Sequence, residues 1–171
     1  AVRFPGADVW PLTPLQSGLY FQSQMASRDP SAVDDGLSAG AASVDVYVTQ
    51  AVLHLGGDVD RSRLRSAAEE LVAHHRVLRS GYVRTPGGAL VTVVPPRVDL
   101  PWSEVSLEAG LDDLGAAQRV REIADAERIT PFDLENPPLM RFVGVEHAAG
   151  SATTLSLIVT NHHILLDGWS G

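Results

Sequence analysis

Residues 153–168 read TTLSLIVTNHHILLDG, an apolar run that ends in two histidines and an Asp-Gly pair. The length and the β-branched content of the run predict a strand over residues 153–161. Side chains alternate between the two faces of a strand. The face of His163 also carries Leu155, Leu157, Val159 and Asn161, whereas His162 shares the other face with Ile158 and Thr160. We therefore expect one histidine to be a catalytic candidate and the other to be a buried, hydrogen-bonded support. The alternative is that both are structural.

The residues after the histidines suit proton chemistry better than metal binding. A histidine here can move protons near neutral pH, and Asp167 can orient it or bind an arginine that holds the loop. Gly168 can present an unhindered backbone N–H to an oxyanion. A metal site at His162, His163 and Asp167 is disfavoured because the two rings point apart and His-Glu-x-x-His is absent. The sequence also lacks the Gly-x-Ser-x-Gly elbow of many hydrolases and the glycine-rich loops that bind phosphates.

The composition excludes several classes of protein. The chain has 171 residues, enough for one domain with a core. Its formal net charge of −8 argues against nucleic acid as a partner. It contains no cysteine, which removes disulfides and thiolate chemistry. No signal peptide or membrane span is evident, so we expect a cytoplasmic protein with no membrane partner.

The remaining pattern alternates between helices and pairs of strands. Thr13-Pro14-Leu15-Gln16 is a capping box that starts a helix at Thr13. The other expected elements are a loop over 27–43, a strand over 44–55, a helix over 60–79 capped by Asp60, a hairpin over 81–84 and 89–94, a helix over 111–129 with Val120, Ile123 and Ala124 inward, and strands over 139–146 and 153–161. This order predicts an α/β (α+β) two-layer sandwich, in which helices pack against one large mixed sheet.

Four ordered segments carry a resemblance to a known family. They are His162 to Gly168 (HHILLDG), residues 10–19 (WPLTPLQSGL), residues 74–82 (HHRVLRSGY), and residues 131–134 with 138–141 (PFDL and PLMR). Together they resemble the condensation domain of nonribosomal peptide synthetases and, more broadly, chloramphenicol-acetyltransferase-like acyltransferases, which share the His-His-x-x-x-Asp-Gly pattern. The segment over 74–82 resembles the family pattern Arg-His-Glu-x-Leu-Arg-Thr-x-Phe. It departs at His74, Arg76 and Ser80 but keeps Arg79.

The resemblance implies a fold and an activity. Family members have two acetyltransferase-like lobes with the active-site tunnel between them, and residues 1–171 resemble the N-terminal lobe, with the C-terminal lobe absent. The family joins a donor acyl or peptidyl thioester to the α-amine of an acceptor aminoacyl thioester. Both substrates arrive on the phosphopantetheine arms of peptidyl carrier proteins, and no cofactor is bound directly. The partners expected are therefore the donor and acceptor carriers and the missing lobe.

The resemblance also implies roles for single residues. His163 corresponds to the catalytic position, as a base or as a group that orients the amine, and the Gly168 N–H is the candidate oxyanion contact. Asp167 is expected to pair with Arg79 and hold the motif loop, with His162 as a second support. The alternative for Arg79 is a cation at a helix C-terminus. Trp10 and Trp169 are expected to be core or rim aromatics.

The sequence also bears on the donor subtype and on the activity of the isolated lobe, and it leaves two alternative functions open. The segment over 10–19 looks closer to domains that accept a D-configured donor than to the L,L class. The lobe alone is expected to be inactive. The alternatives are a coenzyme A-dependent acyltransferase of the same superfamily and a non-catalytic lobe that only docks carrier proteins.

Overall fold

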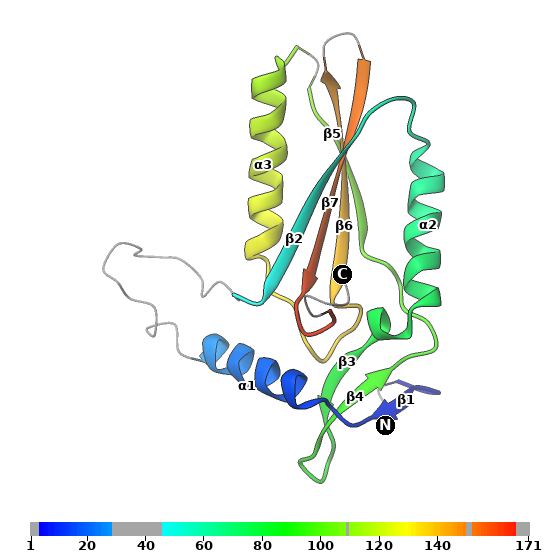
Figure 1. Cartoon of the computed structure of the whole chain (residues 1–171), viewed down its shortest axis with the longest axis vertical. Coiled ribbons are helices and arrows are strands. Elements are labelled where there is room, and N and C mark those ends of the chain that lie inside the picture. The colour runs from blue at the N-terminus through cyan, green and yellow to red at the C-terminus, as the bar shows by residue number, and fades with distance from the viewer. Residues whose placement is uncertain (1–3, 29–45, 109, 150–151, 167–171) are drawn as a thin grey trace, which may run out of the picture.

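A computed structural model describes residues 4–28, 46–108, 110–149 and 152–166 of the chain (Figure 1). The elements run in the order β1 (Asp8–Trp10), α1 (Pro14–Arg28), β2 (Val48–Leu55), α2 (Arg61–His74), the 3₁₀ helix η1 (Arg76–Arg79), β3 (Gly81–Arg84), β4 (Leu90–Val94), β5 (Trp102–Ser106), α3 (Asp113–Ile129), β6 (Met140–Ala149) and β7 (Ala152–His162). Among the described residues, no helix has both the length and the apolar character needed to cross a membrane.

The strands form two sheets in place of one large sheet. The larger sheet has the order β2-β7-β6-β5, and the smaller one has the order β1-β4-β3. β7 is antiparallel to both of its neighbours, whereas β5 and β6 are parallel because α3 carries the chain back between them. The larger sheet is therefore mixed, as the sequence predicts.

Helices cover both faces of the larger sheet (Figure 1). On one face, Val120 and Ala124 of α3 pack against Val143 and Ile158. On the other face, α2 joins a core cluster that contains Phe142 and Leu157 of the sheet. The sequence correctly predicts an α/β fold in which helices pack on a mixed sheet. The expected sandwich had one sheet layer and one helical layer, and the structure adds a second helical layer on the other face of the sheet.

Side chains set the starts of the helices as the sequence predicts. The Thr13 N–H donates to Gln16 Oε1 at 3.0 Å, and the Gln16 N–H donates to Thr13 Oγ1 at 3.2 Å, which is the reciprocal capping box. Asp60 accepts from the Arg63 N–H at 3.1 Å and caps α2. The hydrogen bond from the Ser62 hydroxyl, followed by that from the Arg63 N–H, lowers the pKa of Asp60.

Some boundaries differ from the expected ones. The helix expected over 60–79 ends at His74, because His75 adopts an extended conformation (φ −91°, ψ 104°) before η1 begins. This break turns Leu78 and Arg79 into the core. The strand expected over 44–55 begins at Val48, and most of the loop expected over 27–43 lies outside the described residues. The short strands β1 and β5 were not predicted.

Candidate functional site

β7 ends with His162 at the lower end of the larger sheet, and His163 begins the turn that follows (Figure 1). Val48 pairs with His162 and Thr49 with Asn161, so the alternation of faces continues to the end of the strand. The His162 side chain is fully buried, whereas His163 is half-buried. The hydrogen bond from the Leu165 N–H to the His162 carbonyl, 3.1 Å long, closes the turn. The histidines are thus adjacent in the chain, but their rings lie in different surroundings.

The buried ring of His162 is hydrogen-bonded at both nitrogens. The Ile164 N–H donates to His162 Nδ1 at 3.1 Å, so Nδ1 carries no hydrogen. Nε2 lies 3.4 Å from Ser23 Oγ on α1, and the ring of Phe132 meets the imidazole edge-on with a centroid distance of 6.5 Å. This is the neutral Nε2–H tautomer in a closed site. His162 can brace the turn, but it is poorly placed to reach a substrate.

His163 is held by its backbone while its ring is left available. The His163 N–H donates to the Tyr47 carbonyl at 2.6 Å. Among the residues that the structure describes, none makes a hydrogen bond to the His163 ring. A half-buried imidazole on a fixed backbone can accept or donate a proton, or orient an amine.

The next residue, Ile164, is reached by a hydroxyl from the smaller sheet. The Tyr82 hydroxyl donates to the Ile164 carbonyl at 3.1 Å and accepts from Gln16 Nε2 at 3.2 Å. Burial raises the pKa of Tyr82, an effect that the hydrogen bond from Gln16 partly opposes. Neither Tyr82 nor Gln16 was expected at the site from the sequence. Two signals were present: the capping glutamine, and a tyrosine where the family pattern has phenylalanine.

Gly81 allows Tyr82 to reach this position. A Cβ atom at Gly81 would lie 2.7 Å from Pro137 Cδ, which is closer than real contacts allow. The Tyr82 N–H also donates to the Leu134 carbonyl at 2.8 Å. The segment around residues 134–137 therefore packs directly against the start of β3.

Arg79 is buried and bonded to backbone carbonyls. Its Nε donates to the Pro95 carbonyl at 3.1 Å, and Nη1 donates to the Val72 carbonyl at 2.8 Å and to the Ala73 carbonyl. Two of these acceptors belong to the last turn of α2, so the alternative of a cation at a helix C-terminus describes the observed contacts. Asp167, the expected partner of Arg79, lies outside the described residues, as do Gly168 and Trp169.

Other residues of the motifs lie at the rim of the smaller sheet. The Arg76 guanidinium pairs with Asp8 and stacks over the Trp10 ring at 5.0 Å from its centroid. Trp10 itself is 38% exposed, which fits the expected rim aromatic. The rings of His74 and His75 meet edge-on with a centroid distance of 5.0 Å.

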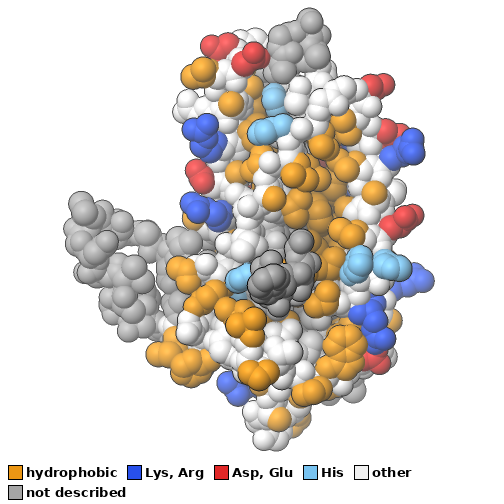
Figure 2. Space-filling model, in the orientation of Figure 1, with side chains coloured by type: hydrophobic (Ala, Val, Ile, Leu, Met, Phe, Trp, Pro, Cys, Tyr) orange, Lys and Arg blue, Asp and Glu red, His pale blue; other side chains and the backbone are white. Residues whose placement is uncertain are grey.

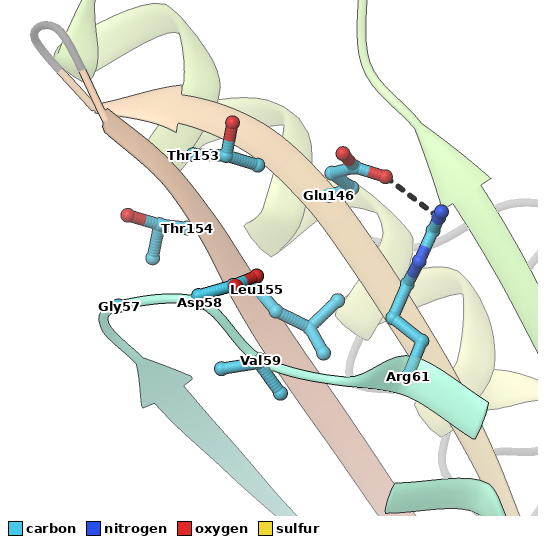
Figure 3. A pocket seen from close by; sticks show the side chains of 8 residues that line it. All are labelled: Gly57, Asp58, Val59, Arg61, Glu146, Thr153, Thr154 and Leu155. Atoms are coloured by element: carbon cyan, nitrogen blue, oxygen red, sulfur yellow. Dashed lines mark hydrogen bonds and ion pairs between the residues drawn. The ribbon is translucent and has the colours of Figure 1, made fainter. Parts of the chain in front are cut away.

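A separate hollow lies at the far end of the larger sheet. It has a volume of about 470 Å³ and is lined by Gly57, Asp58, Val59, Arg61, Glu146, Thr153, Thr154 and Leu155 (Figure 3). Thr154 is eight residues before His162 on the same strand, which places the hollow about 26 Å from the histidines. Arg61 is already paired with Glu146 at 2.6 Å and lies 3.6 Å from Glu104. This hollow is therefore distinct from the histidine site.

The face between α3 and α2 exposes apolar side chains. Figure 2 shows hydrophobic side chains gathered along the middle of this face, with charged side chains mostly along its flanks. Leu53 on β2 is 48% exposed, and Leu71 on α2 is 45% exposed. Leu53 pairs with Leu157, so it points to the side of the sheet that α2 covers.

The comparisons with known proteins identify one family. The model of the condensation domain family matches residues 6–171. Chondramide synthase of Chondromyces crocatus is 34% identical over 190 residues, a match that covers 96% of this chain and 5% of that protein. A linear gramicidin synthase of Brevibacillus parabrevis is 32% identical, with 94% of this chain and 3% of that protein covered. The chain thus spans a small fraction of the relatives that it matches.

Solved structures show the same fold. The starter condensation domain of rhizomide synthetase RzmA (mutant R148A) matches with a TM-score of 0.74 at 16% identity, covering 95% of this chain and 34% of that chain. The first condensation domain of the calcium-dependent antibiotic synthetase, in complex with a substrate analogue, matches with a TM-score of 0.69 at 25% identity. That match covers 94% of this chain and 34% of the solved chain.

Proposed function

Because the chain belongs to the condensation domain family, we propose that it is the N-terminal lobe of a peptide-bond-forming domain in a nonribosomal peptide synthetase. The observation that carries the proposal is the placement of His163, which has a fixed backbone and an available ring. The relatives include synthetases of chondramide and linear gramicidin, and the chain covers about a third of the solved condensation domains.

In the proposed reaction, the α-amine of the acceptor attacks the thioester carbonyl carbon of the donor. A C–N bond forms, the tetrahedral intermediate collapses, and the C–S bond breaks. The amine loses a proton, and the thiol of the donor phosphopantetheine arm gains one. An α-amine has a pKa of about 7.7, so a large share of it is neutral at pH 8. His163 therefore needs to supply little basicity, either as the proton acceptor or as the group that orients the amine.

The other expected site residues have supporting roles in the proposal. The Gly168 N–H faces the oxyanion of the intermediate, and Asp167 holds the loop. Donor and acceptor carrier proteins present the substrates at the two ends of a tunnel that a C-terminal lobe completes. The donor carries a D-configured end residue, a proposal that rests on the sequence of residues 10–19 alone.

The test compares histidine variants of the whole condensation domain that contains this chain. With carrier-loaded donor and acceptor, His163→Ala should lower kcat about a hundredfold or more and leave the melting temperature unchanged. His162→Ala should instead lower the melting temperature, because it opens a buried, hydrogen-bonded site. His54→Ala is the matched control, since His54 is exposed at the opposite end of β2. Amide formation at the wild-type rate by His163→Ala would exclude the proposed role.

The 171-residue chain alone should form no amide from the same substrates. One wall of the proposed tunnel and part of the carrier docking surface belong to the second lobe. Product formation by the isolated chain, detected by mass spectrometry, would contradict the proposal that two lobes are required.

A further inference from the structure

Both backbone polar groups of the residue that follows His163 are tied to side chains. The Ile164 N–H donates to His162 Nδ1, and the Ile164 carbonyl accepts from the Tyr82 hydroxyl, each at 3.1 Å. Ile164 is 2% exposed, so water cannot readily replace either partner. The two peptide groups that flank the Ile164 Cα atom are therefore each oriented by a side chain, the first by His162 of β7 and the second by Tyr82 of β3.

The hydrogen bonds that reach the Ile164 carbonyl form a chain with a fixed direction. Gln16 Oε1 accepts from the Thr13 N–H, so the capping box determines which end of the Gln16 amide is oxygen. Gln16 Nε2 must then donate to the Tyr82 oxygen, and the Tyr82 hydrogen is left for the Ile164 carbonyl. Each of these hydrogen bonds therefore has a fixed donor and a fixed acceptor, and the capping box at the start of α1 determines them.

We propose that Gln16 and Tyr82 are positioning residues for His163, and that the hydrogen-bond relay between them fixes the turn in its reactive geometry. The kinetic part of this inference rests on the proposed function. The relay requires a hydroxyl, and this chain supplies Tyr82 where the family pattern has phenylalanine. A buried tyrosine hydroxyl requires a hydrogen-bond partner, and here the partner is the carbonyl of the residue next to His163.

The first test removes the Tyr82 oxygen alone. In the whole condensation domain, Tyr82→Phe should lower kcat about tenfold and change KM for the carrier-loaded substrates by less than about twofold, because a loosened turn misplaces the ring without affecting carrier docking. The ¹³Cε1–¹H resonance of the His163 ring, assigned with His163→Asn, should shift. Tyr20→Phe is the matched control, since it removes a hydroxyl from another tyrosine that is 4% exposed and lies in the same core cluster.

The second test reverses the relay and keeps the helix cap. Gln16→Glu retains an oxygen that accepts from Thr13 but replaces the amide donor with a carboxylate oxygen. The Tyr82 hydroxyl then turns its hydrogen towards this carboxylate, and the Ile164 carbonyl loses its donor. Gln16 is only partly buried and this substitution preserves its shape, so the variant should fold even where Tyr82→Phe does not. It should lower kcat by a similar factor.

The double variant separates positioning from general support. If the two residues act through one relay, Tyr82→Phe combined with Gln16→Glu should lose no more activity than the worse single variant. Multiplied losses would overturn the proposal, as would wild-type kcat in both single variants, or a His163 resonance that stays in place in both. If the wild-type domain forms no amide, the proposed function fails. The His163 ring resonance then tests the positioning proposal without kinetics. It should shift in both single variants, and the shift in the double variant should be no larger than that of the worse single variant.

Discussion

The burial of Tyr82 affects the protonation of its own hydroxyl group. The side chain is fully buried, and burial raises the pKa of its hydroxyl above the ordinary value of 10. The folded protein therefore keeps the phenolic proton at a pH where the unfolded chain releases it. The stabilising effect of the neutral hydroxyl is complete below pH 10 and is lost as the pH rises towards the folded-state pKa.

The difference in the Tyr82 pKa between the folded and the unfolded chain predicts that the folded state loses stability at alkaline pH through this residue. Above pH 10 the free energy of unfolding should fall by about 1.4 kcal/mol per pH unit through Tyr82 alone. Urea unfolding between about pH 9 and pH 11.5 measures the slope, and Tyr82→Phe should remove this contribution. Tyr20→Phe should retain it. A slope that is equal in the wild type and in Tyr82→Phe would show that the hydroxyl ionises equally in both states.

The sequence predicts the faces of the histidines but not the contacts that hold them. Alternation along β7 follows from backbone geometry alone, and it correctly separates buried His162 from half-buried His163. The contacts of Tyr82 with Gln16 and Ile164 span 66 and 82 residues along the chain. Such pairings depend on how the smaller sheet, α1 and the turn meet, and no local pattern encodes this arrangement.

At the scale of elements, the Arg79 side chain caps the end of α2. Its guanidinium donates to carbonyls of Val72 and Ala73 in the last turn and to Pro95 before β5. The sequence pattern continues the helix through residue 79 because Leu78 and Arg79 suit a helix. It cannot show that the side chain of Arg79 folds back and takes the place of the next turn. The hairpin and α3 were predicted closely because their signals, a Gly-rich turn and the periodic spacing of Val120, Ile123 and Ala124, are local.

Removal of this arginine should destabilise the fold. Arg79→Ala leaves buried carbonyls without a donor, and we expect a loss of about 3 kcal/mol in the free energy of unfolding. Arg79→Lys should recover part of the loss, because an ammonium reaches fewer of the three acceptors. Chemical denaturation measures both. Arg65→Ala is the control, since Arg65 is exposed on the same helix. A loss below about 1 kcal/mol in Arg79→Ala would contradict the expected role.

The expected pairing of Asp167 with Arg79 can be measured in the same series. If the pair forms, Asp167→Ala should cost about 3–5 kcal/mol, and the double variant should show strong coupling. If Arg79 acts only through the carbonyls, Asp167→Ala should leave stability within about 1 kcal/mol of the wild type. Either result assigns the buried charge to one set of partners.

At the scale of the whole molecule, β2 forms one edge of the larger sheet, with no strand beyond it among the residues that the structure describes. The His163 N–H bonds to the Tyr47 carbonyl, so the odd-numbered residues of β2 face β7 with their backbone groups. The N–H and C=O groups of Val48, Gln50, Val52 and His54 then point to the free edge. Among the described residues, no other backbone group binds them. The strand contains no Lys, Arg, Asp, Glu or Pro, the residues that usually protect such an edge.

The exposed side chains of the same strand predict self-association of the 171-residue chain. Leu53 is 48% exposed beside the apolar face, and burying it against a second copy removes that surface from water. Leu53→Lys should therefore lower the sedimentation coefficient at high concentration to that of the monomer. Leu114→Lys is the matched control, because Leu114 is 82% exposed and belongs to α3 and not to β2. Equal association of both variants would mean that copies meet through another surface. A monomeric wild type at every concentration would mean that water alone satisfies the free edge.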